Sequence, residues 1–189
     1  MIFGLFRGDD EKKAVERLYV EIVAASRQPP LYTALHVPDS LEGRFEALTL
    51  HVALVQRQLK AIGAPAARVG QLLTECFFAD LDSAMREIGI GDMGVPRKMK
   101  TLAGAYFGRL AAYDAMLAPG GDPEATLARN LLGVGTEPEA VASARPVAAY
   151  AAGVAAALST RDLAGILALG AADFVVPTEP LADPSEARS

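Results

Sequence analysis

The chain has 189 residues, a length that suits one domain with a single hydrophobic core. Its 18 Lys and Arg and 23 Asp and Glu give a net charge of −5, which argues against general nucleic-acid binding and against a specific DNA partner. Hydrophobic residues make up 51% of the sequence and aromatic residues only 6%, with no Trp, so Ala, Leu and Val must fill the core. This bias favours closely packed helices.

The N-terminus and the apolar runs of the chain indicate its cellular location. The N-terminus, MIFGLFRGDDEKK, lacks the basic start of a signal peptide, and its apolar run is too short for one. The longest uncharged stretch, Pro146 to Thr160, is shorter than the roughly 20 residues that span a bilayer. We therefore expect a cytoplasmic protein. Two roles stay open for the apolar tip at Ile2, Phe3, Leu5 and Phe6: docking on the body, or peripheral contact with the inner membrane.

Helical spacing of apolar residues recurs through the first two thirds of the chain. A first helix is predicted from about Asp9 to Ser26, and a Pro-rich connector with one helical turn follows it. Asp39 is predicted to cap a second helix, with Glu42 completing a capping box, and Gly63 to end it. The third and fourth helices are predicted at 66–88 and 96–117.

The fourth predicted helix has two stripes. Its core seam alternates spacings of four and three: Met99, Ala103, Tyr106, Leu110, Tyr113 and Leu117. Its second stripe consists of small residues: Gly104, Gly108, Ala111 and Ala115. Small residues let another backbone come close, and we interpret this stripe as tight packing by a neighbouring helix.

After a sharp break at Pro119 to Pro123, the sequence predicts further short helices. One runs over 124–132, an Ala-rich one over 138–158 with a kink or break at Pro146, and a last one, capped by Thr160, ends near Leu169. The fold class is therefore an all-α, single-domain bundle of about six to seven helices without a β-sheet. Its predicted parts are core helices at 9–118, C-terminal helices packed on them at 119–176, and a flexible tail at 177–189.

The stretch REIGIGDMGVPRKMK, Arg86 to Lys100, breaks the helical pattern. Its glycines free the backbone, and Arg97, Lys98 and Lys100 crowd the first turn of a helix, where the dipole disfavours each exposed cation by roughly 0.3–1 kcal/mol. Two interpretations stay open: an irregular corner between helices, or a partner surface with adaptable methionines and a cationic rim. The residues predicted to bind a partner are Met85, Ile90, Met93, Val95, Arg97, Lys98, Met99, Lys100 and Phe107.

Residue sets that support catalysis or a cofactor are not recognisable in the sequence. There is no nucleophile with a base, no phosphate loop followed by Lys and Ser or Thr, and no set of ligands at metal spacing. The single cysteine, Cys76, excludes an internal disulfide, and we expect it to be a buried, inert thiol. His51 lies beside the apolar stripe of its helix and is expected to be half-buried with its polar atoms satisfied. We therefore predict a non-enzymatic protein without cofactor or metal.

Four segments together resemble a known family. They are YVEIVAASRQPPLY (19–32), VPDSLEGRFEALTLH (37–51), FFADLDSAMREIGIGDMGVPRKMK (77–100) and AYFGRLAAYDAML (105–117). Their order and spacing over about residues 15–118 resemble the ubiquinol–cytochrome c chaperone family, the assembly factors of the cytochrome bc1 complex. The combination of EGRFE, REIGIGD and VPRKMK is the most specific part of this resemblance.

The resemblance implies a non-enzymatic chaperone that binds newly made cytochrome b until it enters the bc1 complex. Mitochondrial relatives act with a small partner protein near the ribosomal tunnel exit, whereas a chain without a transit peptide is similar to the bacterial version. Two alternatives stay open. One is a carrier of haem or another small molecule with a helical pocket, using His51 or His36 for haem. The other is a ribosome-docking module that uses the basic cluster Arg97 to Lys100.

Overall fold

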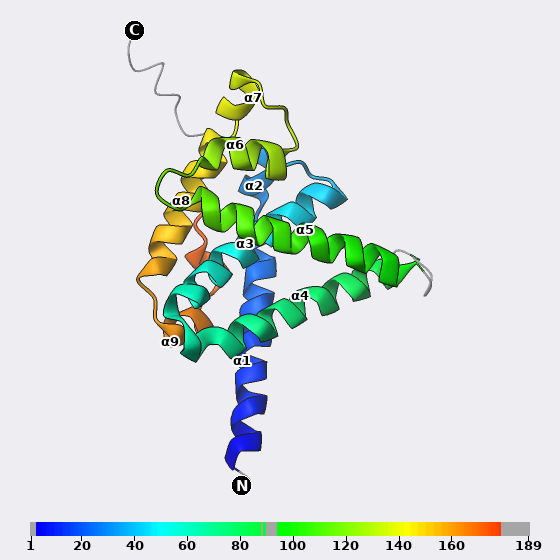
Figure 1. Ribbon diagram of the computed structural model, residues 1–189, viewed down its shortest axis with the longest axis vertical. Coiled ribbons are helices and arrows are strands. Elements are labelled where there is room, and N and C mark those ends of the chain that lie inside the picture. Colours follow the sequence, from blue (N-terminus) through cyan, green and yellow to red (C-terminus); the bar gives the residue numbers. More distant parts are fainter. Residues whose placement is uncertain (1–2, 88, 90–93, 179–189) are drawn as a thin grey trace.

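The computed structural model describes residues 3–87, 89 and 94–178, with side chains from residue 8 onward. Nine α-helices and no strand are found in these residues (Figure 1). The long helices are α1 (Phe3–Ser26), α3 (Leu41–Ile62), α4 (Ala67–Glu87), α5 (Val95–Met116) and α8 (Arg145–Ser159). The short helices are α2 (Pro29–Thr33), α6 (Pro123–Leu127), α7 (Pro138–Ala142) and α9 (Leu163–Leu167). A π-helical turn, Ala128–Leu132, extends α6, and 3-10 turns lie at Ala64–Ala66 and Ala171–Asp173.

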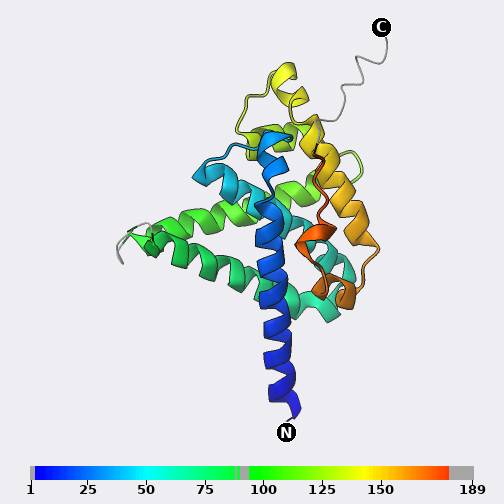
Figure 2. The ribbon, with the colours of Figure 1, turned by 180° about the vertical axis from the view of Figure 1, so that it is seen from behind.

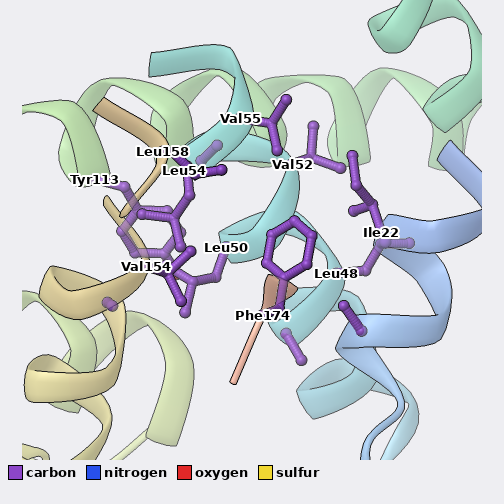
Figure 3. Close-up of a cluster of buried hydrophobic side chains, with 14 of the residues drawn as sticks. Ile22, Leu48, Leu50, Val52, Leu54, Val55, Tyr113, Val154, Leu158 and Phe174 are labelled. Atoms are coloured by element: carbon purple, nitrogen blue, oxygen red, sulfur yellow. The ribbon is translucent and has the colours of Figure 1, made fainter. Parts of the chain in front are cut away.

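Helix α3 is the centre of the core. Residues 47–55 are all buried, so this part of the helix is covered on every side by α1, α4, α5 and α8. Figure 3 shows Leu50 and Leu54 of α3 beside Val154 and Leu158 of α8 and Tyr113 of α5. The same view shows Phe174, which follows α9, among them, and it is fully buried. The C-terminal helices therefore belong to the same core as the N-terminal ones.

Helices α4 and α5 form a wedge. The end of α4 at Glu87 and the start of α5 at Val95 lie close together at the far end of the molecule, and the two helices separate toward the body, where α3 lies between them (Figures 1 and 2). The first half of α1 projects beyond the other helices, at the end of the molecule away from α6 and α7 (Figures 1 and 2). Because α1 begins at Phe3 and not near Asp9, the apolar tip lies largely on this helix; the side chains of residues 1–7 are not described.

The predicted all-α, single-domain class is confirmed, with more helices than the six to seven expected. The Ala-rich pattern divides at Ser143 and Ala144 into α7 and α8, and Pro146 stands in the first turn of α8, where its missing N–H costs no hydrogen bond. The connector turn at Pro29–Thr33 adds another short helix. The predicted division into core, C-terminal part and tail stays a prediction, and residues 179–189 of the tail lie outside the described part.

Two predicted helix caps are wrong. Helix α3 begins at Leu41, so Ser40 is its cap and accepts a hydrogen bond from the Gly43 N–H at 3.1 Å. Asp39 instead pairs with Arg44 at 2.7 Å. At α9 the cap is Asp162, which accepts from the Gly165 N–H at 2.8 Å. Thr160 lies two residues before this cap, and its hydroxyl donates a hydrogen bond to the Ala157 carbonyl at the end of α8.

The interpretation of the small-residue stripe on α5 as a packing surface is also wrong. Gly104, Gly108, Ala111 and Ala115 are exposed, and a Cβ at either glycine would meet nothing within 4 Å. The core seam is as predicted at its centre, since Tyr106 and Tyr113 are buried. One face of α5 therefore packs on α3 and α4, and the small residues face away from them.

Candidate functional site

An apolar groove lies where α4 and α5 separate, and the first turns of α3 form its third wall. Its volume is about 340 Å³, enough for a few aliphatic side chains. The groove residues are Leu41, Glu42, Phe45 and Glu46 of α3, Leu81, Ala84 and Met85 of α4, and Leu102 and Ala105 of α5. Other hollows on the surface are lined by polar and charged side chains, among them Gln56, Arg57, Lys60 and Asp114. Compared with these hollows, the groove is therefore better suited to apolar side chains.

The segment that begins α3 is fixed closely against the connector before it. A Cβ on Gly43 would overlap the carbonyl group of Pro38, so only glycine allows this approach. The Ser40 cap and the Asp39–Arg44 pair hold the same turn. The sequence VPDSLEGRFE thereby sets where Leu41 and Phe45 stand on the groove wall.

The wall formed by α3 is joined to α5 through Glu46. Arg109 donates to its two carboxylate oxygens from Nε and one terminal nitrogen, each at 2.8 Å. These hydrogen bonds raise the pKa of Arg109 above its usual value. The Tyr113 hydroxyl also donates to Glu46, at 3.5 Å. Of the two carboxylates on the groove, this one is therefore neutralised by a guanidinium.

Of the predicted partner-binding residues, Met85 lies on the groove, with only 5% of its surface exposed. Val95 is buried at the start of α5, and Met99 is half-buried one turn later. Arg97, Lys98 and Lys100 are exposed in the same two turns of α5, and none of them lines the groove. Ile90 and Met93 lie outside the described residues, as does most of the predicted glycine corner, of which Gly89 has a φ of 81°.

Phe107 is not brought to the groove. It follows Leu102 by five residues, which puts about 140° between the two side chains around the helix axis. Phe107 is 57% exposed, and its ring lies against Tyr106 and the half-buried Phe78, with centroid distances of 5.1 and 6.2 Å. It borders a different hollow, with Ala53, Leu110 and Lys60.

Sequence reasoning missed most of the groove. The helical spacing of Phe45 and Leu81 is that of core residues, and each is half-buried at the edge of the core. Leu41 carried a usable signal: it is a large apolar residue in an otherwise polar helix start, and it is 67% exposed. Leu102 and Ala105 lie off the predicted core seam of α5. Their role depends on how far α4 and α5 separate, which no local pattern encodes.

Two further observations limit the chemistry of the described residues. No group of three or more His, Cys, Asp or Glu among them could hold a metal ion. His51 is fully buried, not half-buried as predicted, with Nδ1 at 2.7 Å from the Ala47 carbonyl and Nε2 at 2.7 Å from the Tyr150 hydroxyl. A carbonyl only accepts, so Nδ1 carries the proton and Nε2 accepts from Tyr150. Burial lowers the pKa of His51 to about 4.

Comparison with known proteins identifies the family. The model of the ubiquinol-cytochrome C chaperone family matches residues 33–174. The chain belongs to this family. The match extends well past residue 118, where the resemblance seen in the sequence ends, so it includes the C-terminal helices through α9. The region matched by the family model thus includes most of the segment after Pro119, where the sequence motifs showed no resemblance.

A solved structure supports the same assignment. The crystal structure of the Cbp3 homolog from Brucella abortus matches with a TM-score of 0.73 and 34% identity, over 88% of this chain and 93% of that one. No curated protein shows significant similarity to the chain. None of the helices in the described part is long and apolar enough to cross a membrane.

Proposed function

We propose that this chaperone-family protein promotes assembly of the bc1 complex by holding an apolar helical segment of newly made cytochrome b in the groove between α3, α4 and α5. The observation that carries the proposal is the groove itself. Leu41 is largely exposed there, although burial would remove a large apolar side chain from water. Membership of the ubiquinol-cytochrome C chaperone family supports the assembly role and implies a protein without catalytic activity.

The dimensions of the groove fit side chains of a helix that lies across it. A helix with its side chains is about 10–12 Å wide, so 340 Å³ cannot enclose one, but can take the apolar stripe of one face. Met85 adapts to irregular shapes because its side chain is unbranched and flexible. A membrane subunit awaiting assembly exposes such apolar faces, and covering them keeps it from aggregating.

The haem-carrier alternative receives no support from the histidines. Both ring nitrogens of His51 are engaged inside the core, and the low pKa reflects a neutral ring enclosed by apolar residues. His36 is exposed in the connector after α2. Neither position combines a free imidazole with an apolar pocket large enough for a porphyrin.

The basic residues Arg97, Lys98 and Lys100 offer a docking surface that is separate from the groove residues. Their exposure suits a polyanion such as the ribosome, and a small partner protein could also use this end of the wedge. Both partners, and peripheral membrane contact by the projecting α1, stay proposals. Salt dependence of ribosome binding, compared between the wild type and the triple Ala variant, tests the first.

The groove proposal is tested with Leu41→Asp and a matched control. Leu41 is 67% exposed on the groove, and Val20 on α1 is 63% exposed without being one of the groove residues. Since neither substitution puts a charge into the core, both variants should melt close to the parent. Leu41→Asp should lose capture of cytochrome b in an affinity pull-down and lower the assembled bc1 complex, whereas Val20→Asp should retain both.

The comparison can contradict the proposal in two ways. If Leu41→Asp captures cytochrome b as well as the parent while folded, the client does not use this groove. If Val20→Asp loses capture of cytochrome b to the same degree, capture depends on exposed apolar residues in general. The groove would then have no special role.

A further inference from the structure

The groove carries one charge that the fold leaves uncompensated. Two of its residues, Glu42 and Glu46, are acidic, and no basic residue lines it. Glu46 is held by Arg109 through two hydrogen bonds. Glu42 is exposed, and within the described part of the chain its carboxylate makes no ion pair or hydrogen bond. An otherwise apolar groove therefore presents one available carboxylate.

The cations near Glu42 do not neutralise it. Arg44, two residues on, pairs with Asp39, and Arg86 of α4 pairs with Asp82 at 2.7 Å. Lys98 lies one turn before Leu102 on α5, but no ion pair joins it to Glu42 in the described structure. The first turn of α3 gives Glu42 a favourable dipole interaction, which explains why the position tolerates a carboxylate in the free protein.

We propose, on the basis of the proposed function, that the groove selects apolar helical segments that carry a Lys or Arg beside their apolar face. The Glu42 carboxylate pairs with this basic group. An occupant would cover Glu42 and remove it from water. A carboxylate covered without a partner is costly, whereas a basic group on the occupant converts that cost into a charge-assisted hydrogen bond. The groove thereby favours one kind of apolar helix over others of equal hydrophobicity.

The test uses the full-length protein and three synthetic amphipathic helical peptides. The peptides share one apolar stripe and differ only at one position beside it, which is Lys, Gln or Glu. Dissociation constants are measured by fluorescence anisotropy for the parent, Glu42→Gln, Glu42→Lys and the control Glu139→Gln, an exposed carboxylate on α7. Thermal melts establish that each variant is folded.

The parent and Glu139→Gln should bind the Lys peptide about tenfold more tightly than the Gln peptide, and added salt should reduce this preference. Glu42→Gln should bind both alike, and Glu42→Lys should prefer the Glu peptide. Equal binding of all three peptides by the parent overturns the charge selection and leaves the proposed groove intact. If Glu42→Gln still prefers the Lys peptide, another carboxylate pairs with the lysine, and this result also overturns the role proposed for Glu42.

Two outcomes would contradict the groove as well. If none of the peptides binds to the folded parent, the groove does not take an apolar helix, and both proposals fall. If sedimentation shows a stable dimer that Leu102→Asp dissociates, and the peptides do not compete with it, the groove is covered by a second copy of the chain. Dimer formation and peptide binding are read independently, so the two failures are distinguishable.

Discussion

Glu46 of α3 and Arg109 of α5 form a two-pronged ion pair across 63 residues of sequence, with both nitrogen–oxygen distances at 2.8 Å. The side chain of Glu46 is only 14% exposed and that of Arg109 28%. Because Glu46 also lines the groove, this pair fixes the spacing between two of the groove walls. Planar, two-point pairing of this kind specifies geometry in a way that a single lysine contact does not.

Replacing Arg109 by Leu should lower the free energy of unfolding by about 2 kcal/mol, because a largely covered carboxylate loses its partner. Arg109→Lys should lose less, since it keeps the charge but not the second hydrogen bond. Urea denaturation measures both variants. Arg44→Leu is the matched control: it breaks the exposed Asp39–Arg44 pair, whose contribution to the turn before α3 is small, and should change stability much less than Arg109→Leu does. Equal effects of Arg109→Leu and Arg44→Leu would show that the Glu46 pair is only a surface contact.

Two glycines should respond oppositely to the same substitution. Gly43→Ala puts a methyl group into the Pro38 carbonyl and should cost about 1–3 kcal/mol, as overpacking does, while displacing the start of α3. Gly108→Ala meets nothing within 4 Å in the middle of α5 and should raise stability by about 0.5–1 kcal/mol. Thermal melts of both variants check this. Stabilisation by Gly43→Ala would contradict the close approach that positions Leu41 and Phe45.

His51 should make stability depend on pH in a defined window. Its pKa falls from 6.5 in the unfolded chain to about 4 in the core, so between these values only the unfolded chain is protonated. Stability should therefore be fully present above pH 6.5 and decline as pH falls toward 4, by on the order of 3 kcal/mol. Urea titrations from pH 7 to 4 should show a shallower decline for His51→Gln, whereas the exposed control His36→Gln should follow the parent. Parallel curves for His51→Gln and the parent would contradict this.

The fold was largely readable from the sequence because its long helices carry strong apolar spacing. The extents predicted for 66–88 and 96–117 agree closely with α4 and α5. The central place of α3 was less visible, although nine consecutive residues without charge, Ala47 to Val55, are a sign of burial on all sides. The cap errors at Asp39 and Thr160 arose because two side chains near each helix start were able to cap it.

The candidate site was predicted only in part, for physical reasons that differ between residues. Met85 was found because it belongs to the methionine-rich stretch near the wedge tip. Leu41, Phe45 and Leu102 come from three helices, and only the tertiary arrangement shows that they share one groove. Phe107 was predicted to share a partner surface with Met85, but the helical rotation places it on another flank of α5. Binding by any of these residues stays a prediction.

The basic turn at the start of α5 should matter for function more than for stability. Changing Arg97, Lys98 and Lys100 together to Ala relieves the conflict with the helix dipole, so the melting temperature should stay the same or rise slightly. Assembly of the bc1 complex in cells should nevertheless fall. Thermal melts measure the stability, and a spectroscopic assay measures the amount of assembled bc1 complex. A triple variant that unfolds would mean that these cations are structural.

The central claim, that the client lies in the groove, is tested most directly by site-specific photo-crosslinking in cells that make the bc1 complex. A photoreactive residue is placed at Leu102 in the groove, and in a separate variant at Phe107 on the other flank of α5. We expect a covalent adduct with cytochrome b from position 102 and little or none from position 107. An adduct from position 107 alone, with both variants folded and equally abundant, would contradict it.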